Sequence, residues 1–321
     1  MQTVKKLIKT LKNKKRVFIQ THNYPDHDAV ASAFALQYLL KNFKIDAEII
    51  YHGDILRDSL QKMIEKLGIR IQPHYKYELT DSDTLVIVDA NKKNKNVAAL
   101  KGHVAAVIDH HPGIEHEDVE FCDIRSDYGA CASIIFSYFA ELMLEPGREV
   151  ATALHTAINF DTHQFTRNAS PIDIETVAML YQVSDVNLVN SLVRNSIKLE
   201  DLKQYNYLIN NVYVDGIFAY CHFPYGCNKN LLAILADYLL SIEEVEFVVL
   251  STLSSEGVSF CVRSENPELP ANTMIQQILE GKGSGGGHVD MAGGRIPNQK
   301  EFDSEAVCRI CRSLVAHKLR K

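Results

Sequence analysis

The sequence predicts an α/β protein that begins with a doubly wound parallel sheet and ends with a smaller mixed α+β domain. Strand-like and helix-like patterns alternate in the first half. The strand-like runs are apolar throughout, so both faces of the sheet should be buried. The pattern changes after about residue 210. A chain of 321 residues has room for about two domains.

The first half contains four strand-like runs. We expect strands at 16–20, 47–51, 85–88 and 104–108. Helical spacing of apolar residues predicts helices at 29–41 and 54–67, and small and apolar residues at helical spacing indicate further helices between 129 and 180. Strands that alternate with helices favour parallel pairing, because parallel strands need long crossover connections.

The second half has its own set of elements. We expect strands at 212–222, 245–253 and 258–263, and helices at 229–240, 271–280 and 304–318. A polar, helical segment precedes them. The sequence therefore predicts a first domain at 1–185, a helical linker at 186–210 and a second domain at 211–321.

Composition excludes several classes of protein. The net charge is −6, so no broad basic surface is expected for long nucleic acid, and an anionic substrate would need local positive charge. No apolar run reaches the roughly 18–20 residues of a membrane span. The charged N-terminus lacks the apolar core of a signal peptide, and a cytoplasmic location is expected. The seven cysteines, including Cys308 and Cys311, are expected to be reduced structural thiols.

Acidic and imidazole side chains follow the strands of the first half. His22, Asp26 and Asp28 come after the first strand, and Asp89 ends the third. The fourth strand ends in Asp109, His110 and His111, and Asp161 follows a helical stretch. Ligands of open α/β sheets bind outside the carboxyl ends of the strands, so these side chains should meet in one crevice.

The chemical types of these residues match a metal site. Carboxylates mixed with imidazoles and without thiolates suit Mn²⁺, and also Fe²⁺, Co²⁺ or Mg²⁺. Two ions about 3.5–4 Å apart need several ligands around them. Six candidates are available: His22, Asp26, Asp28, Asp89, His110 and Asp161. Taken singly, Asp26 or Asp28 could cap a helix, and His22 could be a structural histidine.

The glycine-rich stretch GKGSGGGH at 281–288 has two interpretations. It could be a flexible linker. We favour a substrate-binding loop, because consecutive glycines allow the backbone amides to approach an anion closely. Gly286, Gly287 and His288 are its candidate binding residues. Arg263 would supply a guanidinium for a phosphate, or else a surface salt bridge.

Together these motifs resemble those of the DHH phosphoesterases. The resemblance lies in HNYPDHDAVAS, in Asp89 of VDA, in DHH at 109–111 and in FDT at 160–162. GSGGGH at 283–288 resembles the signature of the accompanying DHHA1 domain, and VRS at 262–264 its Arg-Ser strand. The resemblance spans nearly the whole chain. It implies a DHH domain, a DHHA1 domain and an active site in the cleft between them.

The most similar subgroup is that of the stand-alone oligoribonucleases, or nanoRNases. These enzymes also remove the 3′-phosphate of phosphoadenosine phosphate, and relatives cleave linear dinucleotides. The resemblance implies that one Mn²⁺ is held by His22, Asp26 and Asp89. It implies a second Mn²⁺ held by Asp28, Asp89, His110 and Asp161, with Asp89 bridging. Asp109 and His111 would be catalytic by supporting these ligands or contacting phosphate.

The first motif departs from the family pattern. Members commonly have Asn before the Pro and Gly between the two aspartates, whereas this chain has Tyr24 and His27 there. The ligand spacing is kept, so the departure affects contacts to substrate and not metal binding. His27 is expected either to add an imidazole near the metals or to be a solvent-facing turn residue.

The sequence therefore predicts a two-metal hydrolase of short substrates. We expect a phosphodiesterase and phosphomonoesterase that acts on short RNA, linear dinucleotides or a nucleoside 3′,5′-bisphosphate. We expect neither a clamp for long nucleic acid nor a membrane partner. The sequence is compatible with a homodimer and does not decide the oligomeric state. One alternative is an inorganic pyrophosphatase or polyphosphatase, against which GGGH argues. The other is a non-catalytic metal- or nucleotide-binding regulator, although no ligand is missing.

Overall fold

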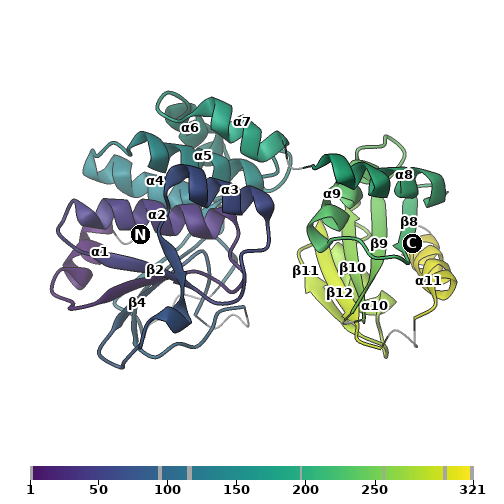
Figure 1. Ribbon diagram of the computed structural model, residues 1–321, viewed down its shortest axis with the longest axis horizontal. Coiled ribbons are helices and arrows are strands. Elements are labelled where there is room, and N and C mark those ends of the chain that lie inside the picture. The colour runs from purple at the N-terminus through teal and green to yellow at the C-terminus, as the bar shows by residue number, and fades with distance from the viewer. Residues whose placement is uncertain are drawn as a thin grey trace. The chain divides into compact units, whose positions relative to one another are not determined.

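The computed structural model describes residues 3–92, 96–113, 118–195, 197–255, 257–298 and 302–318. They form two compact units, divided between residues 196 and 197 (Figure 1). Each unit has its own sheet and its own buried core. None of the helices in the described ranges has the length and apolar character needed to cross a bilayer.

The first unit is built on a six-stranded sheet in which every pair is parallel. Its strands are β1 (Val17–Gln20), β2 (Ala47–Tyr51), β3 (Ile71–Pro73), β4 (Thr84–Val88), β5 (His103–Asp109) and β6 (Phe121–Ile124). Its helices are α1 (Val4–Leu11), α2 (His27–Lys41), α3 (Asp58–Leu67), the 3₁₀ turn η1 (His74–Lys76), α4 (Cys131–Leu142), α5 (Arg148–Asp161), α6 (Pro171–Tyr181) and α7 (Val186–Arg194). The predicted parallel α/β architecture is confirmed.

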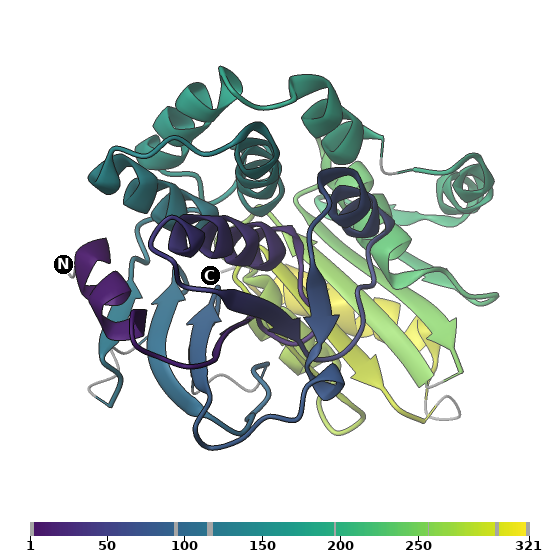
Figure 2. The ribbon, with the colours of Figure 1, turned by 60° about the vertical axis from the view of Figure 1, so that its left-hand side comes forward.

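The strand order β3-β2-β1-β4-β5-β6 reverses direction between β1 and β4. Every residue of β1 and β4 is buried, as their apolar sequences predict. Figures 1 and 2 show α2 lying across one face of this sheet, and α4 and α5 pack against α2. The apolar side chains of the other face pack against non-helical segments around residues 77–79, 97–104 and 119–124. The reversal point is where such sheets bind ligands.

The second unit is built on a mixed six-stranded sheet in the order β11-β12-β10-β9-β8-β7. Its strands are β7 (Tyr213–Asp215), β8 (Phe218–Phe223), β9 (Phe247–Ser254), β10 (Gly257–Ser264), β11 (Ser284–Gly287) and β12 (Met291–Ile296). Its helices are η2 (Leu199–Asp201), α8 (Leu202–Asn211), α9 (Lys229–Leu240), α10 (Ala271–Ile278) and α11 (Ser304–Lys318). Among the described strands of this second sheet, β8 and β9 pair in parallel and the other pairs are antiparallel. The predicted mixed α+β character is confirmed.

The helical segment 186–210 is divided between the two units. In α7, Val189 and Leu192 are buried in the first unit, where the helix packs against α5. In α8, Leu208 is buried in the second unit with the residues of α9. The predicted strand at 212–222 is two strands, because the chain turns at Gly216 between β7 and β8.

The glycine-rich stretch is not the loop that the sequence predicts. Residues 284–287 form β11, which pairs antiparallel with β12. Glycine is needed here because the backbones pack closely: a Cβ on Gly285 would lie 2.7 Å from Ile275, and one on Gly287 would lie 2.4 Å from the Met291 carbonyl oxygen. Glycine inside a strand commonly marks such a close approach. At Gly286, by contrast, an added Cβ would meet no atom within 4 Å.

This contrast predicts that Gly287→Ala destabilises the second unit and that Gly286→Ala does not. The φ of Gly287 is +150°, which an L residue rarely adopts, and its added methyl would overlap the β12 backbone. We expect Gly287→Ala to lose about 1–3 kcal/mol of unfolding free energy. Chemical denaturation followed by circular dichroism measures this loss. Equal stability of the two variants would contradict the packing described here.

Candidate functional site

The acidic and imidazole residues predicted from sequence converge at the carboxyl ends of β1, β4 and β5. His22 and Asp26 lie in the loop after β1, and Asp28 lies in the first turn of α2. Asp89 follows β4, and His110 follows β5. Asp161 ends α5. Three overlapping sets of three ligand atoms lie mutually within 4.8 Å. They are His22, Asp26 and Asp89; Asp28, His110 and Asp161; and Asp89, His110 and His111.

The first set is centred on His22. The Nε2 atom of His22 lies 3.6 Å from Asp26 Oδ1 and 3.6 Å from Asp89 Oδ2. Its Nδ1 atom is 2.9 Å from the Asn23 carbonyl oxygen, so Nδ1–H donates to that carbonyl. This hydrogen bond fixes the ring with Nε2 facing the two carboxylates, as occurs for metal-binding histidines. Asp26 is also the N-cap of α2, since its Oδ1 accepts from the amides of Asp28 and Ala29.

The second set is centred on His110. Its Nε2 atom lies 3.3 Å from Asp161 Oδ2, 3.4 Å from Asp89 Oδ1 and 4.0 Å from Asp28 Oδ2. Its Nδ1–H donates to the Tyr128 carbonyl oxygen at 3.2 Å. His110 is therefore held in the same way as His22, with Nε2 directed at carboxylates.

Asp89 connects the set around His22 to the residues around His110. Its Oδ2 faces His22 and its Oδ1 faces His110, so one carboxylate contacts both groups. The side chain is 2% exposed, and its backbone occupies the left-handed region at φ 58°. A strand-end residue in this conformation carries strain, which is common where a side chain must be aimed at a functional centre. This arrangement is the one that a bridging ligand requires.

Burial and mutual repulsion shift the pKa values of these groups. Burial raises the pKa of Asp28 to about 7, with a further contribution from the Asp89 charge. Burial and the Asp28 charge also raise the pKa of Asp161 well above its ordinary value. Burial alone would lower the pKa of His22, but Asp26 and Asp89 raise it to about 10. The pKa of His110 is raised in the same way.

These residues fit a divalent metal centre. The buried Asp89 Oδ1 and His110 Nε2 have no hydrogen-bond partner in the described part of the chain. Buried polar atoms normally have partners, so unpaired ones directed at a common point indicate a ligand. Ligand atoms each about 2.1 Å from one ion are about 3.0–3.4 Å apart, close to the separations around His110. The donor set of carboxylates and imidazoles suits the harder divalent ions.

The two residues predicted to be catalytic, Asp109 and His111, form a pair beside this centre. His111 Nδ1 lies 2.9 Å from Asp109 Oδ1, and the His111 amide donates to the same oxygen. Asp109 is fully buried, whereas His111 is about one-third exposed and its Nδ1 lies 3.9 Å from Asp89 Oδ1. The Asp109 carboxylate raises the pKa of His111 against the lowering effect of burial. Asp109 therefore orients an accessible imidazole next to the metal centre.

Sequence reasoning missed the residues that hold Asp28. Its two carboxylate oxygens accept from the Cys131 amide at 2.6 Å and the Ala132 amide at 2.8 Å, both at the N-terminus of α4. The Ser32 hydroxyl adds a third hydrogen bond. Unpaired amides and the helix dipole favour a negative charge at this position. No residue type marks backbone donors, so the sequence offered no direct signal for them.

His27 is not the solvent-facing turn residue considered from sequence. It is the first residue of α2, is fully buried and stacks on Phe160, with ring centroids 3.6 Å apart and planes within 7°. Burial, helped by the Arg57 charge, lowers its pKa to about 3. His27 is in none of the sets of clustered ligand atoms. Its stack connects the start of α2 to the end of α5, which carries Asp161.

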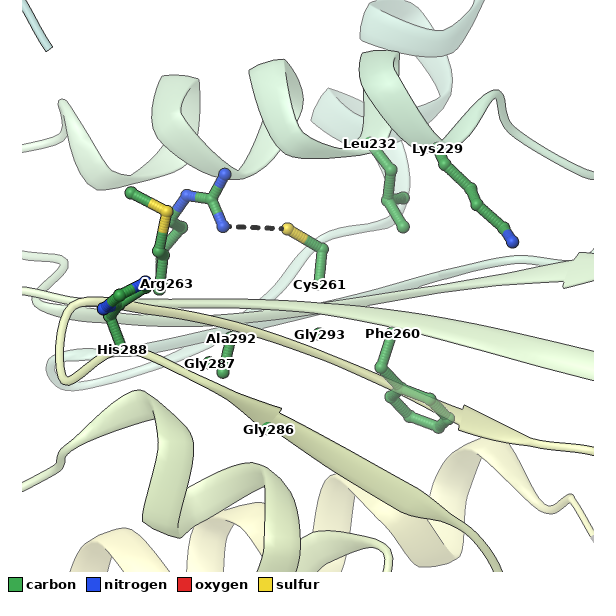
Figure 3. A pocket seen from close by; sticks show the side chains of 11 residues that line it. Lys229, Leu232, Phe260, Cys261, Arg263, Gly286, Gly287, His288, Ala292 and Gly293 are labelled. Carbon is green, nitrogen blue, oxygen red and sulfur yellow. Dashed lines mark hydrogen bonds between the residues drawn. The ribbon is translucent and has the colours of Figure 1, made fainter. Parts of the chain in front are cut away.

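The second unit has a cavity of about 340 Å³, and the binding residues predicted for this unit line it (Figure 3). Arg263, Gly286, Gly287 and His288 line it, together with Lys229, Leu232, Phe260, Cys261, Met291, Ala292 and Gly293. Figure 3 shows Arg263 and Cys261 pointing toward the helix that carries Leu232 and Lys229. Arg263 is 11% exposed, and its Nε donates to Asp237 at 2.8 Å. The surface salt bridge considered from sequence is thus a largely buried ion pair beside the cavity.

Comparison with known proteins agrees with this architecture. Residues 16–158 match the model of the DHH family, N-terminal domain, and residues 211–311 match that of the DHHA1 domain. The chain therefore combines an N-terminal domain of the DHH family with a DHHA1 domain. In a solved structure, an exopolyphosphatase-related protein from Bacteroides fragilis has the same fold, with a TM-score of 0.80 and 19% identity over 98% of this chain and 96% of that one.

Three curated relatives differ in how much of the chain they match. The uncharacterized protein MJ1633 of Methanocaldococcus jannaschii is 30% identical over 98% of this chain, which spans only 66% of that relative. The bifunctional oligoribonuclease and PAP phosphatase NrnA of Mycoplasma genitalium is 25% identical over 98% of both chains. A probable manganese-dependent inorganic pyrophosphatase of Lactobacillus gasseri is 26% identical over 52% of this chain and 54% of its own.

We predict that Asp89→Ala removes metal binding both at His22 and at His110 while the protein stays folded. One carboxylate facing both histidines cannot be replaced by a neighbour. Bound Mn²⁺ should fall from about two ions per chain to fewer than one. Equilibrium dialysis with elemental analysis measures this, and circular dichroism checks the fold. The matched control is Asp46→Ala, at an exposed site before β2. An Asp89→Ala protein that keeps two ions would exclude the bridging role.

We also predict that metal affinity rises with pH. The metal-free His22 keeps its proton up to a pKa of about 10, and Asp28 titrates at about 7. A ligand must lose its proton to bind an ion, so binding releases protons. Between pH 6 and 8 the apparent Kd for Mn²⁺ should fall at least about tenfold per pH unit, most steeply below pH 7. Competition with a fluorescent chelator measures Kd, and a Kd independent of pH would contradict the assignment.

Proposed function

We propose that the protein is a two-metal hydrolase of short oligonucleotides, linear dinucleotides or nucleoside 3′,5′-bisphosphates. The single observation that carries this proposal is the position of Asp89, whose two carboxylate oxygens face His22 and His110. Ions bound there polarise phosphoryl oxygens and lower the pKa of bound water. Mn²⁺ matches the mixture of carboxylates and imidazoles best, with Mg²⁺, Fe²⁺ and Co²⁺ as alternatives.

The residues of the first unit have separate roles in this proposal. His22 and His110 are held through Nδ1, so their Nε2 atoms stay directed at the ions. Asp109 holds the His111 ring, whose exposed edge can contact a phosphoryl oxygen or move a proton. These groups are oriented before substrate arrives, which lowers the cost of reaching a reactive geometry.

The second unit supplies the contacts that select a nucleotide. Its cavity combines an apolar lining at Leu232 and Phe260 with cationic or imidazole groups at Lys229, Arg263 and His288. An apolar surface with a few charged groups suits a nucleoside that carries phosphate. Pyrophosphate has no apolar group that could pack against this lining. The full-length similarity to a bifunctional oligoribonuclease and PAP phosphatase supports this reading over the half-length similarity to a pyrophosphatase.

We predict that catalytic efficiency falls as the substrate lengthens. The net charge of −6 leaves little surface to bind many phosphates of a long strand. With Mn²⁺, kcat/KM should be highest for substrates of about two to five nucleotides and lower for a 24-mer. The measurement is a length series that includes phosphoadenosine phosphate, pyrophosphate and polyphosphate.

Two outcomes of this series would contradict the proposal. A kcat/KM that rises steadily to the 24-mer would indicate a processive exonuclease. Activity confined to pyrophosphate or polyphosphate would make the protein an inorganic phosphatase. Absence of hydrolysis with every substrate, in a protein shown to bind two ions, would favour the regulatory alternative.

A further inference from the structure

Four rings lie at the carboxyl ends of β1, β2 and β3, beside the metal centre. They belong to Tyr24, His52, His74 and Tyr75, which we call the ring strip. Tyr24 is 54% exposed and Tyr75 is 72% exposed. His52 is also exposed, and His74 is half-buried at the start of η1. None of these rings is needed by the proposed ligand set, and the departure of Tyr24 from the family motif is otherwise unexplained.

The ring strip is held by specific contacts. The Tyr24 amide donates to the His52 carbonyl oxygen at 2.8 Å, which joins the loop after β1 to the loop after β2. The Tyr24 ring lies against Gly53, where an added Cβ would be 2.7 Å from its Cδ1 and Cε1 atoms. His52 Nδ1 and His74 Nε2 share a hydrogen bond at 2.9 Å. These contacts hold the rings of Tyr24, His52 and His74 in place as a preformed aromatic surface.

The geometry of these rings suits stacking. The ring centroids of His52 and His74 are 5.1 Å apart, with planes tilted by 31°. Those of His74 and Tyr75 are 6.0 Å apart and nearly perpendicular. Exposed aromatic and imidazole rings of this kind stack nucleobases that are not paired in a duplex.

The strand order places the ring strip directly beside the metal centre. Tyr24 lies in the chain between the proposed ligands His22 and Asp26. From β1 the strip extends across β2 to β3, away from β4. Neighbouring strands are about 4.8 Å apart, so the strip reaches about 10 Å from β1. A nucleoside attached to a phosphate at the metal centre has the size to lie over it.

A cation adjoins the same edge of the sheet. Arg57 is exposed at the start of α3. It ends the loop that leaves the carboxyl end of β2, the same loop that carries His52 of the ring strip. In a chain of net charge −6, such a guanidinium attracts a phosphate toward this end of the sheet.

We propose that the ring strip is a nucleobase-stacking subsite that binds the nucleoside on one side of the scissile phosphate. This inference rests on the proposed function and extends it, because it makes a base on that side a determinant of affinity. Substrates with a nucleoside on both sides of the phosphate would then be preferred over a nucleoside bisphosphate. Arg57 assists by electrostatic attraction, and the stack is supplied by Tyr24 and the His52–His74 pair.

The chain contains no tryptophan, which allows a direct test. Tyr24→Trp would be the only tryptophan and would report a base that stacks on it. The matched control is Tyr38→Trp, on α2 of the same unit and 39% exposed. The probes are an ApA analogue with a hydrolysis-resistant methylene-phosphonate linkage and two versions of it, each lacking one base. All are titrated into Mg²⁺-loaded protein, with equilibrium dialysis to establish saturation.

We expect the complete analogue to quench the emission of Tyr24→Trp, and one of the two abasic versions to leave it unchanged. The emission of Tyr38→Trp should respond to none of them. Saturating binding without a response in Tyr24→Trp, or equal responses to both abasic versions, would contradict the proposed stacking subsite but not the proposed function. Failure of the complete analogue to bind wild-type protein in dialysis would contradict the proposed function as well.

A kinetic comparison separates stacking from a structural role. Tyr24→Ala should raise KM for ApA about tenfold with kcat changed less than about twofold, and Tyr24→Phe should keep the wild-type KM. The abasic substrate that lacks the stacked base should show the same KM with wild type and Tyr24→Ala. Equal losses on both substrates, or a loss in Tyr24→Phe matching that in Tyr24→Ala, would overturn the proposal. Thermal unfolding of each variant confirms that the fold is kept.

Discussion

Four carboxylates meet at the carboxyl ends of the first unit's strands, and their repulsion is the constraint on which the site depends. They belong to Asp26, Asp28, Asp89 and Asp161. Burial strengthens this repulsion, because charges interact more strongly away from water. The chain offsets part of it with helix N-termini and histidines. Amides at the start of α2 donate to Asp26, amides at the start of α4 donate to Asp28, and His22 and His110 face the cluster. Divalent cations would offset the rest and would stabilise the folded state by binding.

The topology explains why these groups can be held so closely. The strand order reverses between β1 and β4, so the connections leaving these two strands diverge and open a crevice between them. Asp26 and Asp89 lie on its two sides. The helices α2 and α4 begin there, and the amides and partial positive charge of their N-termini stabilise the carboxylates of Asp26 and Asp28. The His27–Phe160 stack then ties the start of α2 to the end of α5 and so limits the movement of Asp161.

Much of this arrangement could be predicted from sequence. Apolar runs located β1, β2, β4 and β5, and the acidic residues that follow them indicated the metal cluster. The strands β3 and β6 were missed, because IQP has only three residues and Asp123 interrupts the apolar run of FCDI. The run at 284–287 was read as a loop, because only the close packing of β12 and α10 makes a glycine strand favourable. The amides that hold Asp28 belong to the backbone, which no residue type reveals.

The central claim is that Asp89 bridges two divalent ions. Crystals grown with Mn²⁺ and measured at the manganese absorption edge test it most directly. The account predicts two anomalous peaks about 3.5–4 Å apart, one beside His22 and Asp26 and the other beside His110 and Asp161, with Asp89 between them. A single peak, or a pair of peaks that Asp89 does not contact, would contradict it.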